Sequence, residues 1–138
     1  MLFLTLAMLA SPAEIPADGW TCRNQLEVWC AADGCAAARE GEFTPLDIHA
    51  SVKGELSVCA YSGCWETASA PVRKGGRILW AADEVAFSSG ADGAMTADVT
   101  LLIVEKDGVG FVRVGGLATP LLCVRTKPGL QESEEQAE

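Results

Sequence analysis

Six cysteines carry the clearest chemistry in this 138-residue chain, because two pairs of them recur in the same local setting. Two segments, which start at Cys30 and Cys59, both read Cys-Ala-x-x-Gly-Cys. Four residues that end in Gly form a tight loop between strands, and the positions flanking such a loop face each other at about 5 Å between Cα atoms. That separation is within disulfide range, so we expect Cys30 to pair with Cys35 and Cys59 with Cys64.

The remaining two cysteines, Cys22 and Cys123, lie near opposite ends of the candidate domain. A disulfide between them would close a long loop and contribute roughly 4–5 kcal/mol in the chain-entropy model. The four sulfurs of the repeated segments also have the paired spacing of a structural zinc site. An even number of cysteines behind an export signal favours three disulfides, so we expect no metal and no other cofactor.

Residues 1–13 form a short apolar run that ends in Ser-Pro-Ala, the pattern of a secretory signal peptide with its cleavage site. About ten apolar residues suit a signal core and are too few to span a bilayer. We expect cleavage after Ala13 or Ala17 and delivery to the periplasm or to the outside of the cell. No Lys or Arg precedes the apolar run, so a buried N-terminal strand is the alternative interpretation.

Short β-rich runs broken by Gly, Pro and Asp fill residues 20–127, and this pattern predicts one all-β domain. Asp107-Gly108 between two such runs is the strongest hairpin signal. The predicted strands cover residues 26–31, 36–42, 56–60, 65–70, 77–82, 85–88, 97–104, 109–114 and 117–125, although residues 36–40 could equally form a helical turn. Residues 99–104 lack polar alternation, which favours a closed barrel of about eight strands. We therefore expect a small antiparallel barrel or compact sandwich stapled by disulfides.

The formal net charge is −9, and residues 128–138 carry mostly Glu and Gln. This last segment has no apolar periodicity, so we expect a disordered acidic tail. An acidic surface repels phosphate backbones and anionic lipid headgroups. The charge therefore disfavours nucleic acid and membrane surfaces as partners and favours a basic protein, although an unknown protein or small ligand of another kind stays possible.

None of the familiar hydrolase, nucleotide-binding or dinucleotide-binding motifs occurs in the sequence, so an enzyme would have to use dispersed carboxylates. Asp47, Asp83 and Glu84 would need to converge in one pocket at a barrel mouth with a raised pKa. The single histidine, His49, lacks a second histidine for a metal pair and is better explained as a hydrogen-bonded or exposed residue. We therefore favour a protein that is not an enzyme.

Two predicted loops are the candidate contact sites. Tyr61 and Ser62 lie at the tip between the second pair of cysteines, where a large side chain is available for binding. Residues 88–93 form a second loop between two predicted strands, although a plain Gly/Ser connector explains it as well. The candidate binding residues of this second loop are Ser88, Ser89, Gly90 and Asp92.

Four tryptophans either line a ligand-binding face or pack in the core. Trp80 is flanked by Ile78 and Leu79, and Trp29 lies in the apolar run before Cys30. We expect both of these tryptophans to be core residues.

Three stretches read Gly-Glu-Phe-Thr-Pro-Leu-Asp at residues 41–47, Cys-Ala-Tyr-Ser-Gly-Cys-Trp-Glu at residues 59–66 and Pro-Leu-Leu-Cys at residues 120–123. They resemble a family of small exported bacterial six-cysteine proteins of unassigned activity. This resemblance implies a periplasmic location. Ser89-Gly90 is similar to the loop that periplasmic inhibitors of c-type lysozyme, disulfide-tied β barrels, insert into the enzyme, although the aromatic residue that follows it there is absent here. We therefore expect an exported, non-enzymatic binding or inhibitory module.

Overall fold

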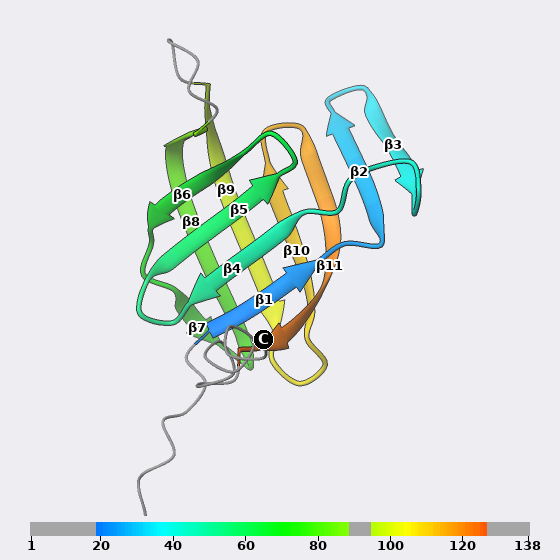
Figure 1. The fold of residues 1–138 in the computed structure, drawn as a ribbon. Helices are drawn as coiled ribbons and strands as arrows, with labels where there is room; N and C mark the ends of the chain where they lie inside the picture. The colour runs from blue at the N-terminus through cyan, green and yellow to red at the C-terminus, as the bar shows by residue number, and fades with distance from the viewer. Residues whose placement is uncertain (1–18, 89–94, 127–138) are drawn as a thin grey trace, which may run out of the picture.

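The structure, a computed structural model, describes residues 19–88 and 95–126. Within these ranges the chain forms eleven β-strands and no helix, which confirms the all-β prediction (Figure 1). The strands are β1 (Gly19–Arg23), β2 (Leu26–Ala31), β3 (Gly34–Arg39), β4 (Asp47–Ser51), β5 (Glu55–Ala60), β6 (Gly63–Ala68), β7 (Val72–Lys74), β8 (Arg77–Ala86), β9 (Thr96–Val104), β10 (Val109–Val114) and β11 (Leu117–Arg125). The predicted signal peptide and acidic tail lie outside the described residues.

One antiparallel sheet with the order β6-β5-β4-β1-β11-β10-β9-β8-β7 makes up the body of the protein. The sheet curls into a half-barrel, so that β4, β5 and β6 lie across β8 and β9 on the other side of one core (Figure 1). The β2–β3 hairpin is off this path and reaches β11 through β2. The predicted small antiparallel barrel is confirmed as this half-barrel. The predicted closure by about eight strands is only partial, because among the described residues β6 and β8 meet at a single isolated bridge, between Trp65 and Phe87, and not through a continuous ladder.

The first and last strands of the sheet form its central seam. β1 pairs with β11 on one side and with β4 on the other. The strands β4 to β6 therefore extend from one side of the seam, and β10 to β7 extend from the other. Cys22 and Cys123 are register partners in this seam, and their buried disulfide joins the two strands directly.

Inward-facing apolar side chains fill the space that the curled sheet encloses. In β8, Ile78 and Trp80 are fully buried while Leu79 between them is exposed, as expected for a strand with one face on the core. The prediction of Trp80 as a core residue is confirmed. Its indole Nε1 donates a hydrogen bond to the carbonyl oxygen of Ser51 (2.9 Å) at the end of β4. The same side chain therefore packs in the core and links the two halves of the sheet.

Several strand boundaries differ from the predicted ones. Residues 77–82 and 85–88 belong largely to one strand, β8, with a register irregularity between Ala82 and Val85. Glu84 lies in the irregularity with φ 51°, and its backbone N–H donates to Asp98 Oδ1 (2.9 Å), so the ladder continues past it. Strands β1, β4 and β7 were not predicted, and residues 36–39 lie in β3 instead of a helical turn.

The three disulfides join the cysteines that were predicted to pair. Cys22–Cys123 links β1 to β11, Cys30–Cys35 closes the β2–β3 hairpin and Cys59–Cys64 closes the β5–β6 hairpin. No free cysteine is left, since all six belong to these pairs. Three intramolecular disulfides in so small a domain indicate that the protein folds in an oxidising environment.

The seam disulfide closes a loop of 101 residues, whereas Cys30–Cys35 spans only 5. We expect the Cys22→Ala/Cys123→Ala variant to lose roughly 4–5 kcal/mol of unfolding free energy and the Cys30→Ala/Cys35→Ala variant about 2 kcal/mol, because the entropy of loop closure grows with loop length. Urea unfolding of the two variants beside the unmodified protein measures both values. Equal losses for the two pairs would show that the seam has no special role.

Candidate functional site

A cleft of about 700 Å³ opens where the β2–β3 hairpin, the β5–β6 turn and the β10–β11 turn approach one another. We call it the aromatic cleft, because five of the residues that line it are aromatic. Its lining residues are Glu27, Trp29, Glu42, Phe43, Thr44, Leu46, Ala60, Tyr61, Ser62, Trp65, Phe87, Met95, Thr96, Ala97, Val114, Gly115, Gly116 and Leu117.

The floor of the aromatic cleft forms where β6 meets β8. Trp65 and Phe87 are bridge partners, and their ring centroids lie 4.4 Å apart. A Cβ atom on Gly63 would lie 2.9 Å from Phe87 Cζ, so a glycine there makes room for the ring. Ser88 fixes this junction, because its N–H donates to the Cys64 carbonyl (2.9 Å) and its Oγ accepts from the Cys64 N–H (2.9 Å).

One wall of the aromatic cleft is Trp29, whose side chain is 50% exposed. The prediction that Trp29 packs in the core is therefore wrong. Its ring lies over Gly116, where an added Cβ would be 3.2 Å from Trp29 Cε3. The indole Nε1 donates to Glu27 Oε1 (2.6 Å), which orients the ring. The reason for the error is that the β2–β3 hairpin lies beside the core instead of over it.

Two contacts hold β2 against β11 and thereby position Trp29. The hydroxyl of Thr119, which is fully buried, accepts from the Val28 N–H and donates to the Val28 carbonyl (3.1 Å each). The backbone N–H of Cys30 donates to the Gly116 carbonyl (2.8 Å). These bonds lie on either side of Trp29 in the sequence, so this wall of the cleft is fixed to the body of the sheet.

The predicted contact residues have different outcomes. Tyr61 is 85% exposed at the β5–β6 turn, and both Tyr61 and Ser62 line the aromatic cleft. Ser88 does not line it; its hydrogen bonds to Cys64 support the floor. The other three residues, Ser89, Gly90 and Asp92, lie outside the described residues.

Two carboxylates at the aromatic cleft were not among the predicted site residues. Glu27 accepts the hydrogen bond from Trp29, and Glu42 Oε2 accepts from the backbone N–H of Arg39 (2.8 Å). A carboxylate has about four acceptor positions, so both groups retain capacity for a further donor. The described residues that line the cleft include no Lys, Arg or His, so the charge of its lining is negative.

A polar donor in the floor is also unsatisfied. Trp65 Nε1 is buried and has no hydrogen-bond partner among the described residues. A buried donor without an acceptor costs about 1–3 kcal/mol of desolvation. An acceptor on a bound molecule would remove this cost if the molecule reached the floor of the cleft.

The carboxylates considered for catalysis are not part of the aromatic cleft. Asp47 lies on β4, Asp83 and Glu84 lie on β8, and all three are exposed. None of them lines the cleft, so the convergence that an enzyme of this kind requires is not found there.

His49 is part of a short polar chain on the outer face of β1 and β4. Its Nε2 lies 3.1 Å from Asp47 Oδ1, and its Nδ1 lies 3.2 Å from Thr21 Oγ1. A hydroxyl, an imidazole and a carboxylate in this order have the composition of a hydrolase triad. More than half of the His49 and Asp47 side chains is exposed, however, and β1 pairs with strands on both sides. The backbone N–H groups beside Thr21 are therefore engaged in the sheet and do not form an oxyanion hole.

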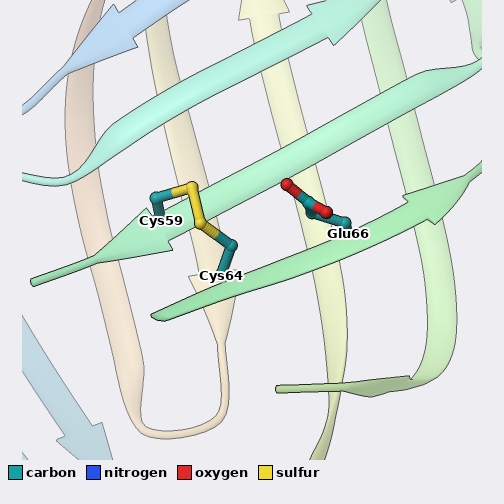
Figure 2. Close-up of side chains that lie close together, drawn as sticks. All are labelled: Cys59, Cys64 and Glu66. Carbon is teal, nitrogen blue, oxygen red and sulfur yellow. A yellow bond between two sulfur atoms is a disulfide. The ribbon is translucent and has the colours of Figure 1, made fainter. Parts of the chain in front are cut away.

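Cys59, Cys64 and Glu66 form the one group of metal-type ligands among the described residues (Figure 2). Their ligand atoms lie within 4.8 Å of one another. The two sulfurs are bonded to each other, however, and thiolates are what zinc requires. The four-thiolate zinc interpretation fails for the same reason, because its other two sulfurs form a second disulfide.

No family model matches the sequence, and no similar curated protein or solved structure was found at a significant level. Among the described residues, no helix is long and apolar enough to cross a membrane.

The contact between Gly116 and Trp29 can be tested by substitution. In the Gly116→Ala variant, the added methyl group should displace the Trp29 ring and weaken its hydrogen bond to Glu27. We expect the Trp29 indole N–H resonance to shift in a ¹⁵N–¹H NMR spectrum, with at most about 1 kcal/mol lost in stability because the ring is half exposed. In a Trp29→Ala background the same substitution should have no effect. An equal loss in both backgrounds would contradict the contact.

Proposed function

We propose that the protein is an exported, periplasmic or secreted, binding or inhibitory module without enzymatic activity, and that the aromatic cleft is its contact site. The observation that carries the proposal is the exposure of Trp29 and Tyr61, which both line this cleft. Large aromatic side chains are enriched at binding sites because they bury much area with little loss of conformational entropy. Exposed aromatic side chains that gather beside one cleft are typical of a contact surface.

The charge of the cleft supports a basic partner. Glu27 and Glu42 add negative charge to an otherwise uncharged lining, and the whole chain carries −9. A cationic side chain that enters between aromatic rings gains from the ring faces and from the carboxylates. This chain contains a simpler contact between a cation and one ring, because Arg125 Cζ lies 4.7 Å from the ring centroid of Trp20. Complementary charge also accelerates the encounter with a basic protein.

Inhibition of a c-type lysozyme is the most specific form of this proposal. It rests on the similarity at Ser89-Gly90, which lie outside the described residues, and on the match between an acidic chain and a basic enzyme. Purified protein should slow lysis of a peptidoglycan substrate by such a lysozyme if this form is right. Failure in that assay removes this one partner and leaves the proposed contact site to the next experiment.

Site-specific photo-crosslinking in cells tests the contact site whatever the identity of the partner. A benzoylphenylalanine at position 61 should give a discrete adduct, because Tyr61 is 85% exposed at the rim of the cleft. The adduct should weaken several-fold when Trp29→Ala is added, since the wall that Trp29 forms is then lost. The same probe at position 55, an exposed site at the other end of β5, is the matched control.

The outcome that contradicts the proposal is equally specific. If positions 61 and 55 give the same adducts, or if Trp29→Ala leaves the adduct at position 61 unchanged, the aromatic cleft is not the contact site. The unfolding temperature of each variant, measured by circular dichroism, shows whether a lost adduct reflects a lost fold.

A further inference from the structure

A second surface, distinct from the aromatic cleft, lies on the outer side of the sheet. Five residues are successive cross-strand partners: Val72 pairs with Leu79, Leu79 with Leu102, Leu102 with Phe111, and Phe111 with Pro120. Cross-strand partners stand next to each other on the same face of a sheet. These five side chains therefore form one continuous row across β7, β8, β9, β10 and β11, which we call the apolar row.

The apolar row faces away from the core. Leu79 and Phe111 alternate with buried neighbours, and Val72 is 63% exposed. On β10 and β11 the apolar surface continues through Val109 and its register partner Leu122. The row thus lies on the face of β8 and β9 that is turned away from β4, β5 and β6 (Figure 1).

An apolar outer face is unusual for an antiparallel sheet. The solvent side of such a sheet normally carries polar residues that alternate with the buried ones. Large contiguous apolar patches on soluble proteins mark surfaces that another molecule covers. The aromatic cleft does not account for this surface, because the apolar row shares no residue with it.

The charges beside the apolar row indicate what covers it. Lys74 and Arg77 are register partners at one end of the strands. Asp83 on β8 and Asp98 on β9 lie beyond the row toward the other end, and all four residues are exposed. On β10 this same side of the row carries an exposed cation, Arg113, so the acidic character of this end belongs to β8 and β9. A two-fold axis along the row would place the apolar row of one copy on that of another. The basic end of each copy would then lie over the acidic end of its partner, as an isologous interface requires.

The size of the face is close to what a stable dimer needs. Five strands about 4.8 Å apart, with a mean length of roughly 25 Å, form a flat area of about 600 Å². Protruding side chains enlarge this area toward the roughly 800 Å² that each partner buries in a stable complex. We propose that the protein forms a two-fold dimer through the outer face of β7 to β11.

Sedimentation equilibrium of the full purified chain tests the dimer. We expect the unmodified protein to have the mass of two chains at micromolar concentration, and Phe111→Glu to raise the dissociation constant at least about thirtyfold. Tyr61→Ala is the matched control, because it removes an exposed aromatic ring from the cleft and should leave the dimer intact. Circular dichroism reports whether each variant is folded.

Two results would overturn the dimer. The first is a monomer up to about 100 μM, whether the face is covered by another part of the same chain or is left for a different partner. The second is a dimer that persists unchanged in folded Phe111→Glu.

A charge exchange tests the orientation of the two copies and does not disturb the apolar row. Arg77→Glu and Asp83→Lys should each weaken the dimer about three- to tenfold, since the two-fold axis repeats every lost ion pair. The double variant Arg77→Glu/Asp83→Lys should recover most of the affinity, because the charges again face opposite charges. A double variant weaker than either single one would overturn the proposed orientation.

Discussion

The pairing of β1 with β11 is the constraint on which the rest of the molecule depends. Cys22 and Cys123 face each other in this seam, and their disulfide is buried. Gly110 makes space for it, because a Cβ atom there would lie 3.2 Å from Cys123 Sγ and 2.8 Å from the Leu102 carbonyl oxygen. The strands on one side of the seam and those on the other can enclose a common core only while this junction holds, since the main sheet path crosses it once.

Both candidate surfaces follow from that curl. The two arms of the sheet meet again at Trp65 and Phe87, and the aromatic cleft opens where the β2–β3 hairpin adds Trp29 beside this junction. The apolar row lies on the outside of the longer arm, where alternation along β8, β9 and β10 directs every second side chain away from the core. One surface is concave and acidic, and the other is a broad sheet face with charges of both signs. They therefore suit different partners, a basic protein for the cleft and a second copy for the sheet face.

The sequence predicted what depends on local geometry. Pairing within each Cys-x4-Cys segment followed from hairpin spacing. The turn after β9 followed from Asp107-Gly108, and Gly108 adopts a φ of 71°, which favours glycine at this position. The strands β1, β4 and β7 have only three to five residues, and so short a run is weak evidence for a strand even where it alternates, as β4 does. Trp29 lies in a run that resembles a core strand, and only the tertiary position of the β2–β3 hairpin exposes it. The acids of the cleft, Glu27 and Glu42, come from separate segments that only the fold brings to one cleft.

Hydroxyl-radical footprinting in intact cells, compared with the purified protein, tests the central claim most directly, that the aromatic cleft is occupied by a partner. The account predicts that Trp29 and Tyr61 are oxidised several-fold more slowly in cells, because a bound partner shields both side chains. His49, which is exposed on the outer face of β4, should react equally in both settings. Unchanged oxidation of Trp29 and Tyr61, or equal protection of His49, would contradict the account.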